Sequence, residues 1–317
     1  MWQGILILNN EAFAYGGGIY FDFSFSQLEN SLIQGNIAGL NGGGLYFLRV
    51  QNRMSGNQIL QNEADFRGSA MVISQPVSET NVSTLSAAND IIANNPAIAE
   101  AVYIHNSALA ARHWTMADNG AEGIRTVNGG SALISNSIVV SHSVAGLTGT
   151  EVLANQLLLS GNGVNCGGDA TCNNVVTGTA AFVNPAALDY RIEVTSAAHN
   201  AGTDVGETVD FEGDARPMCG GFDLGAEEFA GPFAVQNLAV TNVVTDATTL
   251  TATLTWQAVP GTTAYELRVD DSFVTDSSWS NATVLTDSLT TNVFTASLPL
   301  AGQPYFFGLK YRNLCGE

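Results

Sequence analysis

Basic residues are scarce in this sequence. Its 317 residues include 10 lysines and arginines against 29 aspartates and glutamates, a formal net charge of −19 at pH 7. Lys310 is the only lysine. Because binding of phosphate groups needs many cationic side chains, this balance argues against nucleic acid and anionic lipid as partners. With 45% hydrophobic residues the sequence nevertheless predicts a folded chain rather than a disordered one.

Long hydrophobic runs are missing as well. The sequence has no run of 18 apolar residues, so we expect no membrane span within it. Its first residues, MWQGILILNNEA, lack the basic region of a signal peptide and pass directly into a repeat. We therefore expect residue 1 to be an internal cut through a longer protein.

A repeated pattern is present between Ile7 and Ile73. Three copies read ILNNEAFAYGGGIYF, IQGNIAGLNGGGLYF and ILQNEADFRGSAMVI. Matching residues in the three copies are 26 positions apart. A period of this size indicates a solenoid, whose units bury their apolar faces by stacking on each other. The residues in register are Ile7, Ile33 and Ile59; Asn10, Asn36 and Asn62; Ala12, Ala38 and Ala64; and Gly16, Gly42 and Gly68.

The content of each copy favours strands over helices. Apolar runs are short, broken by Gly and Asn, and alternate with period two after each glycine group. This pattern predicts a parallel β-helix with glycines of positive φ at its corners. The asparagines should stack at a spacing of roughly 4.8 Å as a ladder of paired amides. The alternation places Ile19, Phe21, Phe23 and Phe25 on the inward face, and Leu45 and Phe47 likewise.

Later copies of the pattern are less regular. The fourth is shifted by 33 residues, and its extra residues should form a loop at 74–84. The fifth contains Asn119, the sixth spans 135–146, and the seventh spans 152–163. Atypical terminal units are common in solenoids. The residues expected to correspond in the fourth copy are Ile92, Asn95, Ala97 and Ala101.

The strings N-x-A-x-x-x-G-G-G-[IL]-Y at 10–20 and 36–46 resemble repeats of polymorphic outer membrane proteins and of bacterial right-handed β-helix proteins. The resemblance implies a right-handed parallel β-helix of the pectin-lyase-like fold. It implies no particular activity, because these repeats are scaffold.

The segment 182–229 resembles the closing segment of the choice-of-anchor Q family of bacterial surface β-helices. The family pattern, D-Y-R-L, S-P-A-I-D-A-G, D-x-x-G-x-x-R-P and D-x-G-A-x-E, falls at 189–192, 196–202, 210–217 and 223–227. Ala197 replaces the usual proline, and Asn200 follows His199 where the family tends to have aspartate. The resemblance implies a secreted or surface-attached bacterial protein, located outside the cell or on its surface, and no single reaction.

A change of composition after residue 230 predicts a second domain. The runs at 250–269 and 298–313 resemble a fibronectin type III domain, an immunoglobulin-like β-sandwich. Trp256 and Tyr265 would be its core aromatics and Tyr305 its tyrosine corner. We thus expect an all-β chain with a β-helix at 1–230 and a truncated fibronectin-like domain at 231–317.

Cys166 and Cys172 are separated by five residues in a glycine-rich stretch. A zinc site would need two further ligands, and no histidine lies within twenty residues. The spacing therefore favours a disulfide, which fits an oxidising compartment. The state of Cys219 and Cys315 is left open.

The sequence has few candidates for chemistry, and we assign no catalytic residue. The β-helix region has no lysine, and its arginines at 49, 53, 67, 112 and 125 show no rung-to-rung alignment with aspartate. The four histidines, at 105, 113, 142 and 199, share no period, so we expect them to be solvated or at the core edge rather than metal ligands. Asp204, Asp210 and Asp214 share a loop with enough oxygen atoms for calcium, although solvated turn carboxylates are the preferred interpretation. No other cofactor is expected.

Tyr20 and Tyr46 should point outward one rung apart. They could form a flat platform for sugar rings, or they could pack under a loop or stack on each other. The function we expect is a non-catalytic secreted or cell-surface scaffold of adhesin type, with glycans or other cell-surface proteins as partners. The alternative is a polysaccharide lyase or glycoside hydrolase.

Overall fold

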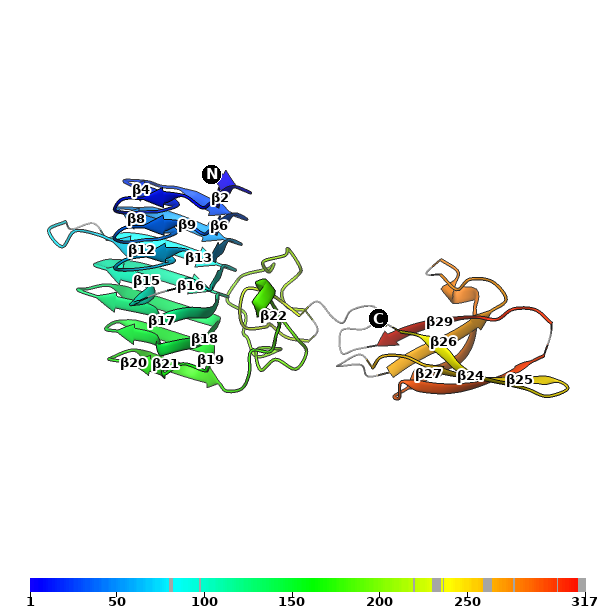
Figure 1. Cartoon of the computed structure of the whole chain (residues 1–317). Coiled ribbons are helices and arrows are strands. Elements are labelled where there is room, and N and C mark those ends of the chain that lie inside the picture. The colour runs from blue at the N-terminus through cyan, green and yellow to red at the C-terminus, as the bar shows by residue number, and fades with distance from the viewer. Residues whose placement is uncertain are drawn as a thin grey trace. The chain divides into compact units, whose positions relative to one another are not determined.

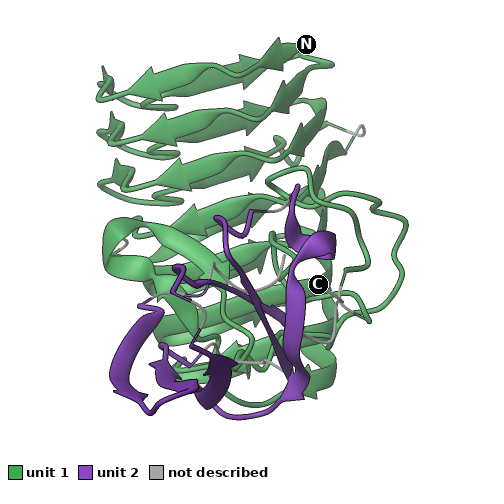
Figure 2. Cartoon of the chain, turned by 90° about the vertical axis from the view of Figure 1, so that its right-hand side faces the viewer, with its two compact units in different colours: residues 1–229 green, residues 230–317 purple. Residues whose placement is uncertain are grey.

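The chain forms two compact units, Met1–Phe229 and Ala230–Glu317, which Figure 2 colours separately. The computed structural model describes residues 1–79, 82–96, 98–218, 220–229, 235, 237–258, 264–275, 277–300 and 302–312. Ala97, Cys219 and Cys315, on which sequence expectations rest, lie outside the described residues.

The first unit is a parallel β-solenoid of about six turns over residues 2–160 (Figure 1). Ile7 pairs with Ile33, Ile33 with Ile59, and Ile59 with Ile92, so the register is the one the repeats predict. Its strands are β1 (Trp2–Gln3), β2 (Leu6–Leu8), β3 (Glu11–Ala12), β4 (Ile19–Asp22), β5 (Gln27–Glu29), β6 (Leu32–Gln34), β7 (Ile37–Ala38), β8 (Leu45–Leu48), β9 (Gln51–Ser55), β10 (Gln58–Leu60), β11 (Glu63–Ala64), β12 (Met71–Ser74), β13 (Ser83–Ala88), β14 (Ile91–Ala93), β15 (Glu100–His105), β16 (Ser107–Arg112), β17 (Thr115–Val127), β18 (Ser131–Gly149), β19 (Val152–Ser160), β20 (Val164–Gly167) and β21 (Thr171–Val176).

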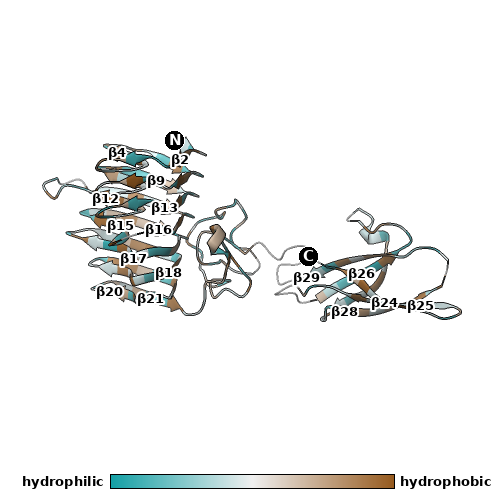
Figure 3. Ribbon diagram, in the orientation of Figure 1, coloured by the Kyte–Doolittle hydropathy of each residue, from teal (hydrophilic) through white to brown (hydrophobic). Residues whose placement is uncertain are grey.

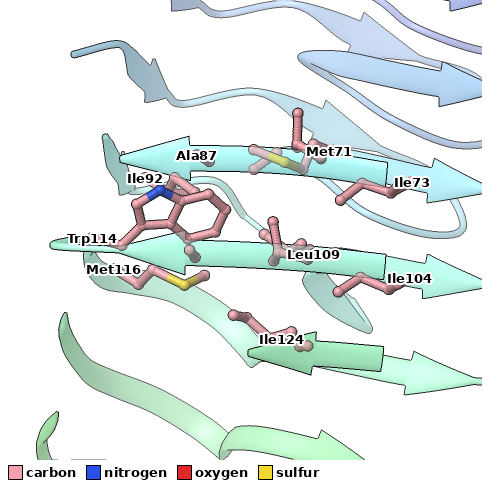
Figure 4. Packing of buried hydrophobic residues seen from close by; sticks show 14 of the residues in the cluster. Met71, Ile73, Ala87, Ile92, Ile104, Leu109, Trp114, Met116 and Ile124 are labelled. Carbon is pink, nitrogen blue, oxygen red and sulfur yellow. The ribbon is translucent and has the colours of Figure 1, made fainter. Parts of the chain in front are cut away.

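The inward columns of the solenoid are largely those predicted. Phe21 and Phe47 are buried, with parallel rings whose centroids lie 5.0 Å apart. Figure 4 shows the same interior deeper in the stack, where Ile73 and Ile104 are partners on neighbouring strands. The prediction was wrong for Phe23 and Phe25, which are 67% and 82% exposed. Phe23 has a φ of 48°, and this left-handed residue ends β4 and interrupts the alternation.

Glycine takes the corner positions that the repeats predict. Gly16, Gly42 and Gly68 have φ values of 63°, 71° and 61°. A Cβ at Gly42 would lie 2.5 Å from the carbonyl oxygen of Leu45. Both the backbone conformation and the space therefore require glycine there.

A second hydrophobic core lies outside the solenoid. The side chains of Leu60, Ile91 and Ile138 point away from the solenoid interior, yet they are buried under residues 180–229. This closing segment includes the antiparallel pair β22 (Phe182–Asn184) and β23 (Asp189–Ile192) and the 3-10 helix η1 (Pro185–Ala187). Strands β10, β14 and β18 are therefore apolar on both faces, as in a sheet covered on both sides.

The second unit contains two antiparallel sheets, ordered β24-β25-β28 and β27-β26-β29, around one shared core. Trp256 and Tyr265 are buried with ring centroids 5.1 Å apart, as expected for the core aromatics. Figure 3 shows hydrophobic and hydrophilic residues on the strands of both units. The elements are β24 (Ala239–Thr245), β25 (Thr249–Thr255), β26 (Ala264–Asp270), η2 (Trp279–Asn281), β27 (Thr283–Leu289), β28 (Val293–Pro299) and β29 (Phe306–Arg312).

The helices among the described residues are short 3-10 turns, and none is long and apolar enough to span a membrane.

Candidate functional site

The predicted asparagine ladder is continuous through the solenoid. The side-chain amide of Asn10 donates to Asn36 Oδ1 at 2.9 Å, and that of Asn36 donates to Asn62 Oδ1 at 2.9 Å. The column continues through Asn95 and Asn119 with donor–acceptor distances of 3.1 and 2.9 Å. Each of these amides from Asn36 onward also donates to a strand carbonyl of the preceding rung, for example Asn62 to Ile33. The buried amides are therefore satisfied along the whole column.

His142 takes the place of asparagine in the sixth rung. Asn119 Nδ2 lies 3.4 Å from His142 Nε2, and His142 Nδ1 lies 3.0 Å from Asn162 Oδ1. These partners fit a neutral imidazole that carries its proton on Nδ1, since Nε2 faces a donor and Nδ1 an acceptor. Burial lowers the pKa of His142 to about 4. The histidine is thus a core residue of the ladder, not a residue of the core edge.

Replacing His142 with asparagine should remove a pH dependence of the solenoid. In the wild type the unfolded chain takes up a proton below pH 6.5, whereas the folded chain does so only near pH 4. Stability from this residue is therefore complete above pH 6.5 and is lost as the pH falls towards 4. Relative to wild type, His142→Asn should gain about 2 kcal/mol between pH 7 and pH 5, because one pKa unit corresponds to about 1.4 kcal/mol. Urea titrations at both pH values, with hydrogen exchange identifying the solenoid, measure this.

The converse variant Asn119→His places a second histidine in the column and should make the solenoid more sensitive to acid. If both variants show the pH dependence of the wild type, His142 is not the neutral ladder residue described here.

A second polar column lies five residues before the first. Asn57 donates from its backbone and its side chain to Asp90 Oδ1, both at 2.8 Å, and Trp114 Nε1 donates to Asp90 Oδ2 at 3.0 Å. Asp90 is fully buried, and burial raises its pKa to about 7 despite the three donors. An asparagine would fit the repeat but could accept only on one side. The carboxylate is required because Trp114 brings a donor into the column.

The closing segment is held by a buried ionic network. Arg216 Nη1 donates to Glu228 Oε1 at 2.5 Å, and Nη2 donates to the carbonyl oxygen of Gly225 at 2.8 Å. Glu228 also accepts from the backbone N–H groups of Asp223 and Met218, each at 2.9 Å. Asp223 in turn accepts from the N–H of Phe229 at 2.6 Å. Arg216, Asp223 and Glu228 are therefore joined in one buried network, in which Arg216 Nε alone of the guanidinium nitrogens has no hydrogen-bond partner among the described residues.

The same network attaches the closing segment to the solenoid. The N–H of Ala226 donates to Thr115 Oγ1 at 2.9 Å, and the N–H of Gly225 donates to the carbonyl oxygen of Asn136 at 2.8 Å. His113 is buried beside this network. Burial is the main cause that lowers the pKa of His113 to about 3, and the positive charge of the nearby Arg216 is the second. The motif seen in the sequence thus closes the outer core.

Two of the three carboxylates proposed for calcium, those of Asp210 and Asp204, accept hydrogen bonds from backbone N–H groups. Asp210 is buried and accepts from the N–H groups of Gly213, Asp214 and Glu228 at 2.8–2.9 Å, while Asp204 accepts from Gly206. Within the described part of the chain no group of three or more His, Cys, Asp or Glu residues is placed to hold a metal ion. Calcium binding here stays a prediction without support from these contacts.

Tyr20 and Tyr46 point outward and are Cα partners, as the alternation predicts. Their rings stack with centroids 5.3 Å apart and an interplanar angle of 18°, and Tyr15 packs against Tyr46 at 5.1 Å. One face of each stacked ring is therefore occupied by the other. The role of the pair as a ligand site stays a prediction.

Arg49 lies on the same side of the solenoid, and here the sequence interpretation was wrong. It forms a two-pronged ion pair with Asp22 of the neighbouring rung, with distances of 2.9 and 2.6 Å, and its guanidinium also lies 3.7 Å from Glu79. Alignment of arginine with aspartate was missed because the two positions differ by 27 residues rather than by the repeat length. The hydrogen bond to Asp22 raises the pKa of Arg49, which favours an ion-pairing residue over a base.

The structure places Cys166 and Cys172 in a disulfide that joins β20 and β21.

Sequence reasoning missed a long groove on the solenoid surface. It has a volume of about 910 Å³ and crosses β9, β13, β16, β18, β19 and β21. A second hollow of about 450 Å³ shares Arg53 and Ser86 with it. The signal in the sequence is a run of small residues at outward positions, among them Ser86, Ala108 and Ala110.

Comparison of the chain with family models, curated proteins and solved structures finds no match.

Proposed function

We propose that the chain is a non-catalytic scaffold of an extracellular or cell-surface protein, with glycans or other cell-surface proteins as partners. The observation that carries the proposal is the unbroken column of amides and imidazole from Asn10 to Asn162. Each rung is tied to the next by buried hydrogen bonds, which makes the solenoid resistant to bending and suited to display a binding surface at a distance.

The finer identification of the units is part of the same proposal. A choice-of-anchor Q type of β-helix is supported by the closing-motif residues Asp210, Arg216 and Asp223, which join in one network. A fibronectin type III domain is supported by the hydrogen bond that Tyr305 Oη donates to the carbonyl oxygen of Pro299 at 2.7 Å, because a tyrosine corner would make a bond of this kind.

The glycan part of the proposal rests on the surface around Tyr20 and Tyr46. On a glycan array, Tyr20→Ala is expected to weaken binding of the full chain about tenfold, because it removes a ring and a hydroxyl from an exposed aromatic pair. Phe273→Ala removes an aromatic that is 75% exposed in the second unit and is the matched control. Equal glycan binding by wild type and Tyr20→Ala would show that the surface around Tyr20 and Tyr46 is not the glycan-binding site.

A polysaccharide lyase or glycoside hydrolase is the second candidate, and the group of residues where its chemistry would lie is Arg49 beside Asp22 and Glu79. Incubation of the full chain with the polysaccharides that it binds, followed by assays for unsaturated products and for new reducing ends, decides between the two. Any cleavage would contradict the scaffold, and loss of that cleavage in Arg49→Gln would place the chemistry at this ion pair.

A further inference from the structure

The side chains that line the groove on the solenoid surface change in character from one end of the groove to the other. Successive Cα partners along it are Arg53, Ser86, Ala110, Leu133, Leu153 and Thr171. The middle is apolar, since Leu133 and Leu153 lie side by side and are 53% and 47% exposed. At the far end Glu151 and Asp169 line the groove and are exposed. The groove thus has Arg53 at one end, where Glu29 and Glu207 line the adjoining hollow, then the two leucines, and the carboxylates of Glu151 and Asp169 on its last two rungs.

Arg53 differs from the other arginines. In the parts of the chain that the structure describes, each of the others pairs with a carboxylate, whereas the side chain of Arg53 has no ion-pair or hydrogen-bond partner. An unpaired guanidinium is notable on a protein with a net charge of −19. It lies exposed where the two hollows meet, so it is open to a carboxylate from outside.

The size of the groove limits its occupant. Neighbouring strands are roughly 4.8 Å apart, so the five steps from β9 to β21 span about 24 Å. An extended chain of about seven residues at roughly 3.3 Å each has this length. The strand backbones below are already paired with the rungs on either side, so the occupant is held by side chains rather than as an added strand.

We propose that the groove binds an extended polypeptide segment of a partner protein. An acidic side chain of the segment pairs with Arg53, its apolar side chains cover Leu133 and Leu153, and a basic side chain pairs with Asp169 and Glu151. A neutral glycan would leave Arg53 unpaired and has no apolar side chains for the two leucines, so the groove's three-part chemistry favours a peptide. The proposal is independent of glycan binding near Tyr20.

Selection of a phage-displayed library of random nonapeptides on the immobilised full chain tests this. Wild type is expected to enrich peptides with an acidic residue near one end, apolar residues between, and a basic residue about six positions away. Arg53→Glu should replace the acidic preference with a basic one, and Asp169→Lys should reverse the preference at the other end. Arg125→Glu, on β17 and outside the groove, is the matched control and should keep the wild-type consensus.

Fluorescence polarisation with one selected peptide provides the second measurement. Arg53→Gln and Leu133→Ser should each weaken its binding tenfold or more, and both change exposed side chains, so circular dichroism should stay that of wild type. The proposal is overturned if no peptide is enriched over unselected phage or if Arg53→Glu selects the wild-type consensus. It is also overturned if Arg53→Gln abolishes glycan binding while peptides are not enriched.

Discussion

Replacing Arg216 with methionine is expected to destabilise the closing segment by about 3–5 kcal/mol, because breaking a buried ion pair leaves an uncompensated charge. The side chains of Arg216 and Glu228 are both inaccessible to solvent. Without the guanidinium, Glu228 would lie buried near Asp210 and Asp223 with no cation among them. Hydrogen exchange of peptides from residues 180–229 measures the loss, which should exceed that in the solenoid rungs.

Arg191→Met is the matched control for this prediction. Arg191 is in the same segment and also pairs with a carboxylate, that of Asp189 at 2.6 Å, but its side chain is 43% exposed. An exposed pair contributes about 1 kcal/mol or less. Equal destabilisation by the two variants would contradict the view that burial of Arg216 makes it the anchor of the closing segment.

Asp90→Asn is expected to cost the solenoid about 2–6 kcal/mol although the two side chains have nearly the same shape. The new amide would direct its NH2 group at the indole N–H of Trp114 and leave both donors buried without acceptors, at about 1–3 kcal/mol each. Trp114→Phe removes one of the facing donors. The double variant should therefore be more stable than the sum of the single effects predicts, by about 1–3 kcal/mol, which is the size of coupling found between residues in contact.

Urea titration of wild type, both single variants and the double variant measures the coupling. Asn62→Asp is the opposite change in the first ladder and should also destabilise the solenoid, because Asn62 donates to Asn95 Oδ1 and to the carbonyl oxygen of Ile33. Strict additivity of Asp90→Asn and Trp114→Phe would show that the carboxylate is not there to accept from the indole.

The two columns also show why the roles of individual residues were harder to predict from the sequence than the fold. Asn10, Asn36 and Asn62 can be recognised in the sequence because they recur at the same position of each repeat. Hydrogen bonding between identical side chains one rung apart follows from this period alone. Asp90, Trp114 and His142 occupy the same columns with different chemistry. Their roles depend on which neighbour donates and which accepts, and this becomes visible only when the rungs are stacked.

The closing motif illustrates a second limit. In the sequence, residues 182–229 resemble a family but give no role for Asp210, Arg216 or Asp223. The carboxylates of the loop at 204–214 led instead to the hypothesis of a calcium site. In the structure these residues accept or donate within one buried network. The apolar outward side chains of Leu60, Ile91 and Ile138 could have signalled a covered face, because exposed strands alternate apolar and polar residues.

The period of 26 residues was enough to predict the parallel solenoid, the glycine corners, the inward columns other than Phe23 and Phe25, and the outward Tyr20 and Tyr46, because in-register stacking makes each rung repeat the geometry of the one before. Tertiary structure alone decided the rest: the outer core under residues 180–229, the pairing of Arg49 with Asp22, and the groove that leads from Arg53 past Leu133 to Asp169. The outer core and the ion pair join residues whose separations in the chain are not multiples of the repeat, and contacts of that kind depend on how the chain packs rather than on the local pattern. The groove follows in-register partners, but which of its side chains stay exposed and unpaired is decided only when the rungs are stacked and the closing segment is in place.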